Sequence, residues 1–93
     1  MGMYILTDGS EKQVKPKNGK HFSLEELQDF VGGYIELLRL PSGGWIVLNE
    51  EGKLRNPPLP INERATLLGS ACGIADDDVI VGNVLVALST EID

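Results

Sequence analysis

The chain has 93 residues, of which 42% are hydrophobic and only 5% are aromatic. This length is enough for one domain with an aliphatic core. The formal net charge is −6, and residues 23–93 carry twelve acidic but only four basic side chains. We therefore do not expect direct binding to nucleic acid, whose backbone requires clustered Lys and Arg.

Signals for a membrane or for secretion are missing from the sequence. No stretch is apolar for long enough to span a bilayer, and the N-terminus lacks the basic and apolar regions of a signal peptide. The single cysteine, Cys72, cannot form an intrachain disulfide, which fits a reducing compartment. We expect a cytoplasmic protein without membrane association.

The N-terminal part, residues 1–22, is predicted to be a hairpin followed by a polar loop. A short apolar run precedes Asp8 and Gly9, a pair that strongly favours a tight turn. In the returning strand, residues 11–15, Val14 is the only apolar side chain. The lysines on either side of it are typical of a strand at the edge of a sheet.

Residues 23–31 are predicted to form a helix with a signal at each end. Ser23 and Glu26 have the spacing of a capping box. Gly32 suits the left-handed conformation that ends a helix. Apolar residues at helical spacing define one face, formed by Leu24, Leu27, Phe30 and Val31.

Two strands are predicted next, at residues 34–40 and 45–48, joined by a Pro-Ser-Gly-Gly turn. The first strand has apolar side chains on both faces. This pattern indicates either a central strand or a strand covered by a partner. Pairing of the two strands would place Glu36 opposite Leu48 or Asn49.

A second helix is predicted after a rigid connector. Residues 53–54 are expected to continue the sheet briefly, and the prolines of residues 55–60 exclude a helix or an interior strand. Asn62 is a good N-cap for the helix, which should end near Gly69 or Gly73. The apolar positions of this helix are Ala65, Leu67, Leu68, Ala71 and Cys72.

The last part of the chain is rich in β-formers, at residues 79–81 and 84–88. Gly82 and Asn83 either join two strands or kink one strand, and we favour a turn that feeds the final strand. The predicted order is ββαββαβ. It indicates an α+β fold in which residues 1–93 form one small domain with a mainly antiparallel sheet and two helices.

Four segments of the sequence resemble a known family. They are GGYIE at residues 32–36, NEEGKL at 49–54, LPINERAT at 59–66 and VIVGNV at 79–84. With this order and spacing, the chain from about Phe22 onward, and above all residues 23–88, is similar to the bacterial and phage family "domain of unknown function 3846". Asn83 stands where the pattern has Asp. The resemblance implies a compact intracellular domain of mobile-element type and supplies no activity, cofactor or catalytic residue.

Most residue types that carry chemistry have a simple structural interpretation here. His21 is expected in a solvated loop, Cys72 in the core, and residues 76–78, three aspartates, in a surface turn without the spacing of a calcium loop. No nucleophile and base, metal-ligand set or phosphate loop is recognisable. We therefore expect no catalytic residue, metal or cofactor.

A small set of side chains remains as candidates for an interaction or a site. Three glutamates come together if residues 34–40 pair with residues 45–48, and grouped carboxylates can act as acid and base or bind a divalent ion. Solvated surface charge is the simpler interpretation. Aromatic residues of the same strands could anchor a partner. The candidates are Tyr34, Glu36, Trp45, Asn49, Glu50, Glu51 and Asn62.

The sequence leaves more than one function open. The favoured hypothesis is a non-enzymatic binding protein whose partner is another protein. A narrower version is an acidic inhibitor that mimics nucleic acid. The rival is a small carboxylate-dependent hydrolase built on Glu36, Glu50 and Glu51. A homodimer formed through residues 34–40 is a further alternative.

Overall fold

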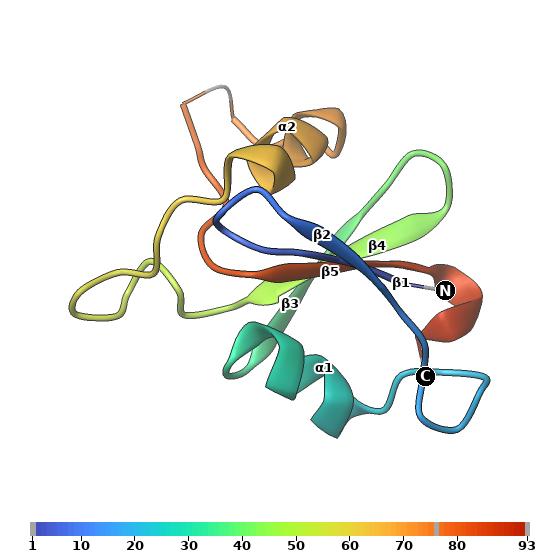
Figure 1. The fold of residues 1–93 in the computed structure, drawn as a ribbon. Helices are drawn as coiled ribbons and strands as arrows, with labels where there is room; N and C mark the ends of the chain where they lie inside the picture. The colour runs from blue at the N-terminus through green and yellow to red at the C-terminus, as the bar shows by residue number, and fades with distance from the viewer. Residues whose placement is uncertain (1, 76, 93) are drawn as a thin grey trace.

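The fold is a five-stranded antiparallel sheet with one helix on each face (Figure 1). The computed structural model describes residues 2–75 and 77–92. The order ββαββαβ confirms the predicted α+β fold. The elements are β1 (Gly2–Ile5), β2 (Glu11–Val14), α1 (Leu24–Val31), β3 (Ile35–Arg39), β4 (Gly44–Asn49), α2 (Glu63–Ala71), β5 (Val84–Leu88) and a 3-10 turn at Ser89–Glu91.

The strand order across the sheet is β2-β1-β5-β4-β3. β5, the last strand in the chain, lies in the centre between β1 and β4. The prediction that β2 is an edge strand is confirmed. Of the two alternatives for residues 34–40, the central strand is wrong, because β3 forms the other edge, and the strand covered by a partner stays a prediction. Its apolar side chains face both ways because Ile35 packs against the core on the α1 side and Leu38 against the core on the α2 side.

Two hydrophobic cores lie on opposite faces of the sheet. Successive residues of a strand point to opposite faces, so neighbours on β4 and β5 contribute to different cores. The core on the α1 side consists of Phe22, Leu27, Val31, Val47, Leu85 and Ala87. The core on the α2 side consists of Ile5, Ile46, Leu48, Ala65, Ile80 and Val84.

Helix α1 begins and ends where the sequence predicts. Ser23 and Glu26 form the capping box, and Gly32 has a φ of 78° as the left-handed C-cap. Leu27 is buried as predicted, but Leu24 is 59% exposed. Helical side chains point toward the N-terminus, so a side chain in the first turn extends past the end of the helix. Leu24 therefore does not belong to the packed face.

Helix α2 packs through small residues, which corrects the predicted apolar face. Leu67 is 75% exposed and Leu68 is 38% exposed. The helix continues past Gly69, which is buried against the core. A Cβ atom on Gly69 would lie 2.8 Å from Ile80 Cδ1 and 2.9 Å from Ile74 Cδ1, so the glycine permits the close approach of the helix.

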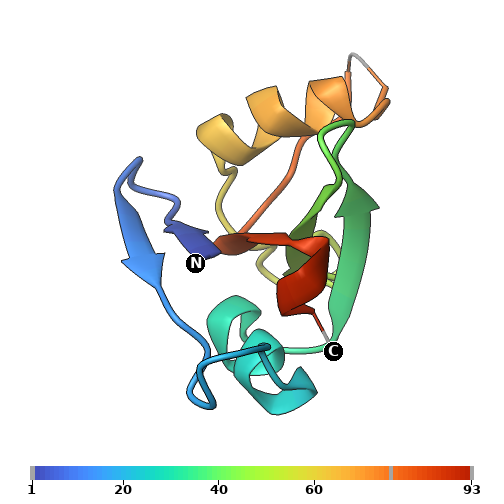
Figure 2. The ribbon, with the colours of Figure 1, turned by 90° about the vertical axis from the view of Figure 1, so that its right-hand side faces the viewer.

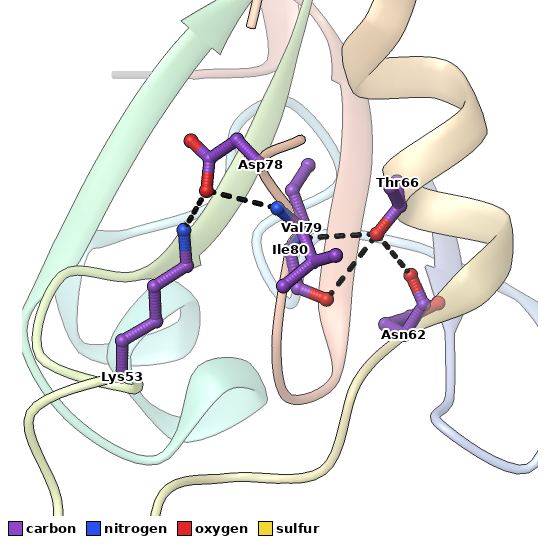
Figure 3. A network of polar contacts seen from close by, with 6 residues as sticks. All are labelled: Lys53, Asn62, Thr66, Asp78, Val79 and Ile80. Atoms are coloured by element: carbon purple, nitrogen blue, oxygen red, sulfur yellow. Dashed lines mark hydrogen bonds and ion pairs between the residues drawn. The ribbon is translucent and has the colours of Figure 1, made fainter. Parts of the chain in front are cut away.

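Two predicted extensions of the sheet do not form. Residues 53–54 lie in a turn, and Leu54 is 83% exposed. Residues 79–81 contribute only an isolated bridge between Ile61 and Val81. The reason is that the backbone of Ile80 is hydrogen-bonded to α2 instead of to a strand. The Ile80 N–H donates to the Thr66 hydroxyl at 2.9 Å (Figure 3).

Candidate functional site

Most of the candidate residues lie on the β3–β4 hairpin or in the loop after it. Asn62 is the exception, because it is the N-cap of α2. In the hairpin, Glu36 lies opposite Leu48, as the sequence predicts. The other candidates in this region are Tyr34, Trp45, Asn49, Glu50 and Glu51.

The three candidate glutamates are divided between two hollows. Glu36 and Glu50 line a hollow of about 160 Å³ on the α2 side of the sheet. Glu51 lines a second hollow of about 270 Å³, together with Tyr34 and Arg55. No group of three His, Cys, Asp or Glu side chains within residues 2–75 and 77–92 is placed to hold a metal ion. A carboxylate-dependent site would require all three carboxylates in one hollow. They do not share one, because Glu51 lies in a different hollow from Glu36 and Glu50.

The hollow with Glu36 and Glu50 contains one basic group, and that group is already paired. Lys53 forms an ion pair with Asp78, whose carboxylate also accepts a hydrogen bond from the Val79 N–H at 2.8 Å (Figure 3). The hydrogen bond from Lys53 is the main reason why the pKa of Asp78 lies below its ordinary value. In the described part of the chain, neither Glu36 nor Glu50 forms an ion pair with a basic side chain.

Asn49 has a structural role. It is only 4% exposed, and its amide N–H group donates to the Val31 carbonyl at 3.0 Å. Its carbonyl oxygen accepts a hydrogen bond from the Glu51 N–H at 2.8 Å. These bonds fix the loop after β4 to the end of α1, so the polar group of Asn49 is turned inward.

Asn62 joins three parts of the fold. It is 1% exposed, and its amide group donates to the carbonyls of Ile5 at 3.1 Å and Gly82 at 2.9 Å. Its carbonyl oxygen caps α2 by accepting from the Ala65 N–H at 3.1 Å. The side chain therefore links β1, the turn before β5 and the start of α2.

The aromatic candidates lie beside β3. Tyr34 is 66% exposed just before the strand. Trp45 is half-buried opposite Arg39, whose guanidinium carbon lies 5.4 Å from the centre of a Trp45 ring. This distance is within the range of a cation–π contact. Trp45 is the only tryptophan of the sequence and lies on β4, so its fluorescence reports on the β3–β4 hairpin.

The backbone of β3 supplies groups that the sequence alone does not reveal. Glu50 donates to the Tyr34 carbonyl at 2.9 Å and Leu40 donates to the Gly44 carbonyl at 2.8 Å. Alternate residues of an antiparallel pair bond to the same neighbour, so residues 34, 36, 38 and 40 face β4. The N–H and C=O groups of Ile35, Leu37 and Arg39 therefore point outward. β3 is the green strand at the right of Figure 2, and no other strand of the described residues lies beyond it.

The two edges of the sheet are protected to different degrees. β2 carries Lys12, is followed by Lys15 and Pro16, and exposes three of its four residues. Lysine and proline are the usual means of preventing edge pairing. β3 is likewise followed by a proline, Pro41, but it carries no lysine, and its central residue, Leu37, is 38% exposed. The interior strands β1, β4 and β5 also lack lysine and proline, so this feature alone does not identify β3 as an edge from the sequence.

The remaining candidates for chemistry are placed as follows. His21 lies in a loop, where its backbone N–H donates to Asn18 Oδ1 at 2.9 Å. Cys72 is half-buried against the core on the α2 side, and burial raises the pKa of its thiol. Of the predicted aspartate turn, residue 76 lies outside the described residues.

Comparison with known proteins identifies the family. The family described as Domain of unknown function (DUF3846) matches residues 1–92. The chain belongs to this family. The DUF3846 match starts well before Phe22 and so includes the β1–β2 hairpin, whose β1 pairs with the central β5. No curated protein and no solved structure matches the chain. None of the described helices is long and apolar enough to cross a membrane.

Proposed function

We propose that this protein is a non-enzymatic binding module that takes an extended segment of a partner protein onto the outer edge of β3. The observation that carries the proposal is the outward direction of the backbone groups of Ile35, Leu37 and Arg39. An extended peptide can pair with such an edge as an added strand. Main-chain hydrogen bonds then supply affinity, and alternate side chains supply specificity.

The side chains around the edge suit this role. Leu37 is partly exposed at the centre of the strand, and Tyr34 is exposed at its start. Arg39 and Trp45 form a cation–π pair at its other end. Aromatic residues and arginine are over-represented at the energetic centres of protein interfaces.

The other hypotheses receive less support from the arrangement of the acidic residues. A hydrolase built on Glu36, Glu50 and Glu51 would need them in one hollow, and they line two. A mimic of nucleic acid would need a continuous acidic surface. Here Lys53 and Arg55 lie beside the carboxylates of the two hollows. We expect the module to work in the cytoplasm, which its single cysteine would suit.

The test is a selection of random peptides displayed on phage, with wild-type protein as the target. Selected peptides are then measured against Leu37→Pro and Gln13→Pro. Proline at 37 removes an outward N–H without removing a bond to β4. Gln13→Pro is the matched control at the opposite edge of the sheet. Leu6 donates to the Ser10 carbonyl, which fixes which residues of β2 bond to β1. In this register the N–H of Gln13 points outward, as that of Leu37 does.

We expect peptides that bind wild type and Gln13→Pro equally and lose at least tenfold in affinity for Leu37→Pro, since an outward hydrogen bond and the Leu37 contact are lost together. Circular dichroism must show that both variants are folded. Leu37→Ala, which keeps the N–H, separates the side-chain contribution. Selected peptides that bind all variants alike would refute docking at β3.

A further inference from the structure

We infer that the segment recognised by β3 carries a basic residue between two apolar residues, so that the preferred partner is a basic, extended segment of a protein. The inference rests on the proposed function and names the chemistry of its partner. The outward backbone of β3 provides the docking element, and the charges beside β3 select the side chains.

The alternation of side chains on an added strand fixes which residues meet. Ile35 and Leu37 carry the outward backbone groups, and their side chains lie on the α1 side of the sheet. In an antiparallel added strand, the peptide residues opposite these two positions form the hydrogen bonds and place their own side chains on the same, apolar side. The peptide residue between them lies opposite Glu36 and places its side chain on the α2 side.

Among the described residues, the α2 side at this position is acidic and has no unpaired basic side chain. Glu36 and Glu50 line the same hollow, and the one basic group of that hollow, Lys53, is paired with Asp78. Within the described residues, neither Glu36 nor Glu50 forms an ion pair. A lysine or arginine opposite Glu36 would therefore be attracted by two carboxylates, whereas an acidic residue would be repelled by both.

The charge of the rest of the protein acts in the same direction. Residues 23–93 carry twelve acidic side chains and four basic ones, so the body of the domain attracts a basic segment before contact. The peptide positions on either side lie opposite Ile35 and Leu37, whose apolar side chains do not attract a charged side chain. The selected pattern is thus apolar, basic, apolar.

The experiment uses three acetylated and amidated peptides. The first is Thr-Thr-Val-Lys-Val-Thr-Thr, and the second has Glu in place of Lys. The third is the lysine peptide with both valines N-methylated, which removes the N–H groups that would bond to β3. Each is titrated into ¹⁵N-labelled protein, and amide shifts in NMR spectra report binding residue by residue, even at millimolar affinity.

We expect the lysine peptide to shift the amides of Ile35, Leu37 and Arg39 and to bind about tenfold more tightly than the glutamate peptide at low salt. The difference should shrink in about 1 M salt, where screening acts over about 3 Å. Glu36→Gln should reduce the difference in affinity between the lysine and glutamate peptides severalfold. Glu51→Gln, which removes the same charge on the other hollow, is the matched control and should leave it unchanged. The N-methylated peptide should not bind.

The alternative outcomes are distinguishable. Equal binding of the lysine and glutamate peptides at β3 would overturn the basic partner and leave docking at β3 intact. A set of shifts that spares β3 would overturn both the inference and the proposed function. If the β3 amides are protected before any peptide is added and lose that protection on dilution, the occupant is a second copy of this chain, and the inference is overturned.

Discussion

Replacement of Asn62 by alanine tests a buried side chain that forms three hydrogen bonds within the fold. Asn62 is 1% exposed and forms hydrogen bonds to three different elements. Alanine removes all three bonds and leaves the N–H of Ala65 and the carbonyl of Gly82 without this partner in a buried region. Buried polar groups without partners are costly, because they have lost water as well.

The magnitude follows from the number of bonds. Each bond contributes about 1 kcal/mol, so Asn62→Ala should lower the free energy of unfolding by about 3 kcal/mol. A domain of this size has a total stability of about 5–14 kcal/mol. The variant should therefore fold, with a clearly reduced urea midpoint. Asn62→Ser retains an oxygen that can cap α2 and lacks the amide donors, so it should recover about 1 kcal/mol.

The assay is equilibrium unfolding in urea, followed by Trp45 fluorescence and by circular dichroism. Coincident transitions would justify a two-state analysis. A loss of only about 1 kcal/mol in Asn62→Ala, fully restored by serine, would show that Asn62 acts as a helix cap alone. That result would refute its assignment as a link between β1, α2 and the turn before β5.

Three further predictions concern single contacts. Lys53→Met should raise the pKa of Asp78 toward its ordinary value of 3.8 in an NMR titration. Because the pKa of Asp78 is lower in the folded state, the ion pair stabilises the protein at pH values above 3.8, and this stabilisation is lost as the pH falls through the folded-state pKa. An unchanged pKa of Asp78 in Lys53→Met would contradict the ion pair. Gly44→Ala should cost about 1–3 kcal/mol in thermal unfolding, since the new Cβ would lie 2.8 Å from the Ala87 carbonyl oxygen, and a neutral result would show that β4 and β5 can move apart. Ser23→Ala should cost about 1 kcal/mol by removing the cap of α1, and no loss of stability would mean that water replaces it.

The elements that the sequence predicts well are those with local chemical signals. The capping box at Ser23 and Glu26, the left-handed Gly32 and the tight turn at Gly9 each depend on neighbouring residues only. The same holds for Asn62 as the N-cap of α2. Such signals act over a few residues, so they can be read without knowledge of the rest of the fold.

The errors concern features that depend on distant pairing. The place of β3 at the edge follows from the insertion of β5 between β1 and β4, a contact between the two ends of the chain. The packed face of α2 follows from the fit of Gly69 against Ile80, which its apolar periodicity does not show. The site depends on register as well, because only the pairing with β4 shows which backbone groups of β3 point outward.

The central claim is that the outer edge of β3 is open and available. Hydrogen exchange of the free protein at low concentration, measured for each amide by NMR, tests it most directly. The amides of Glu36, Leu38 and Leu40 should exchange slowly because they bond to β4, whereas those of Ile35, Leu37 and Arg39 should exchange rapidly. Slow exchange at Ile35 and Leu37 that persists on dilution would mean that this edge is already covered within one molecule, and would contradict the account.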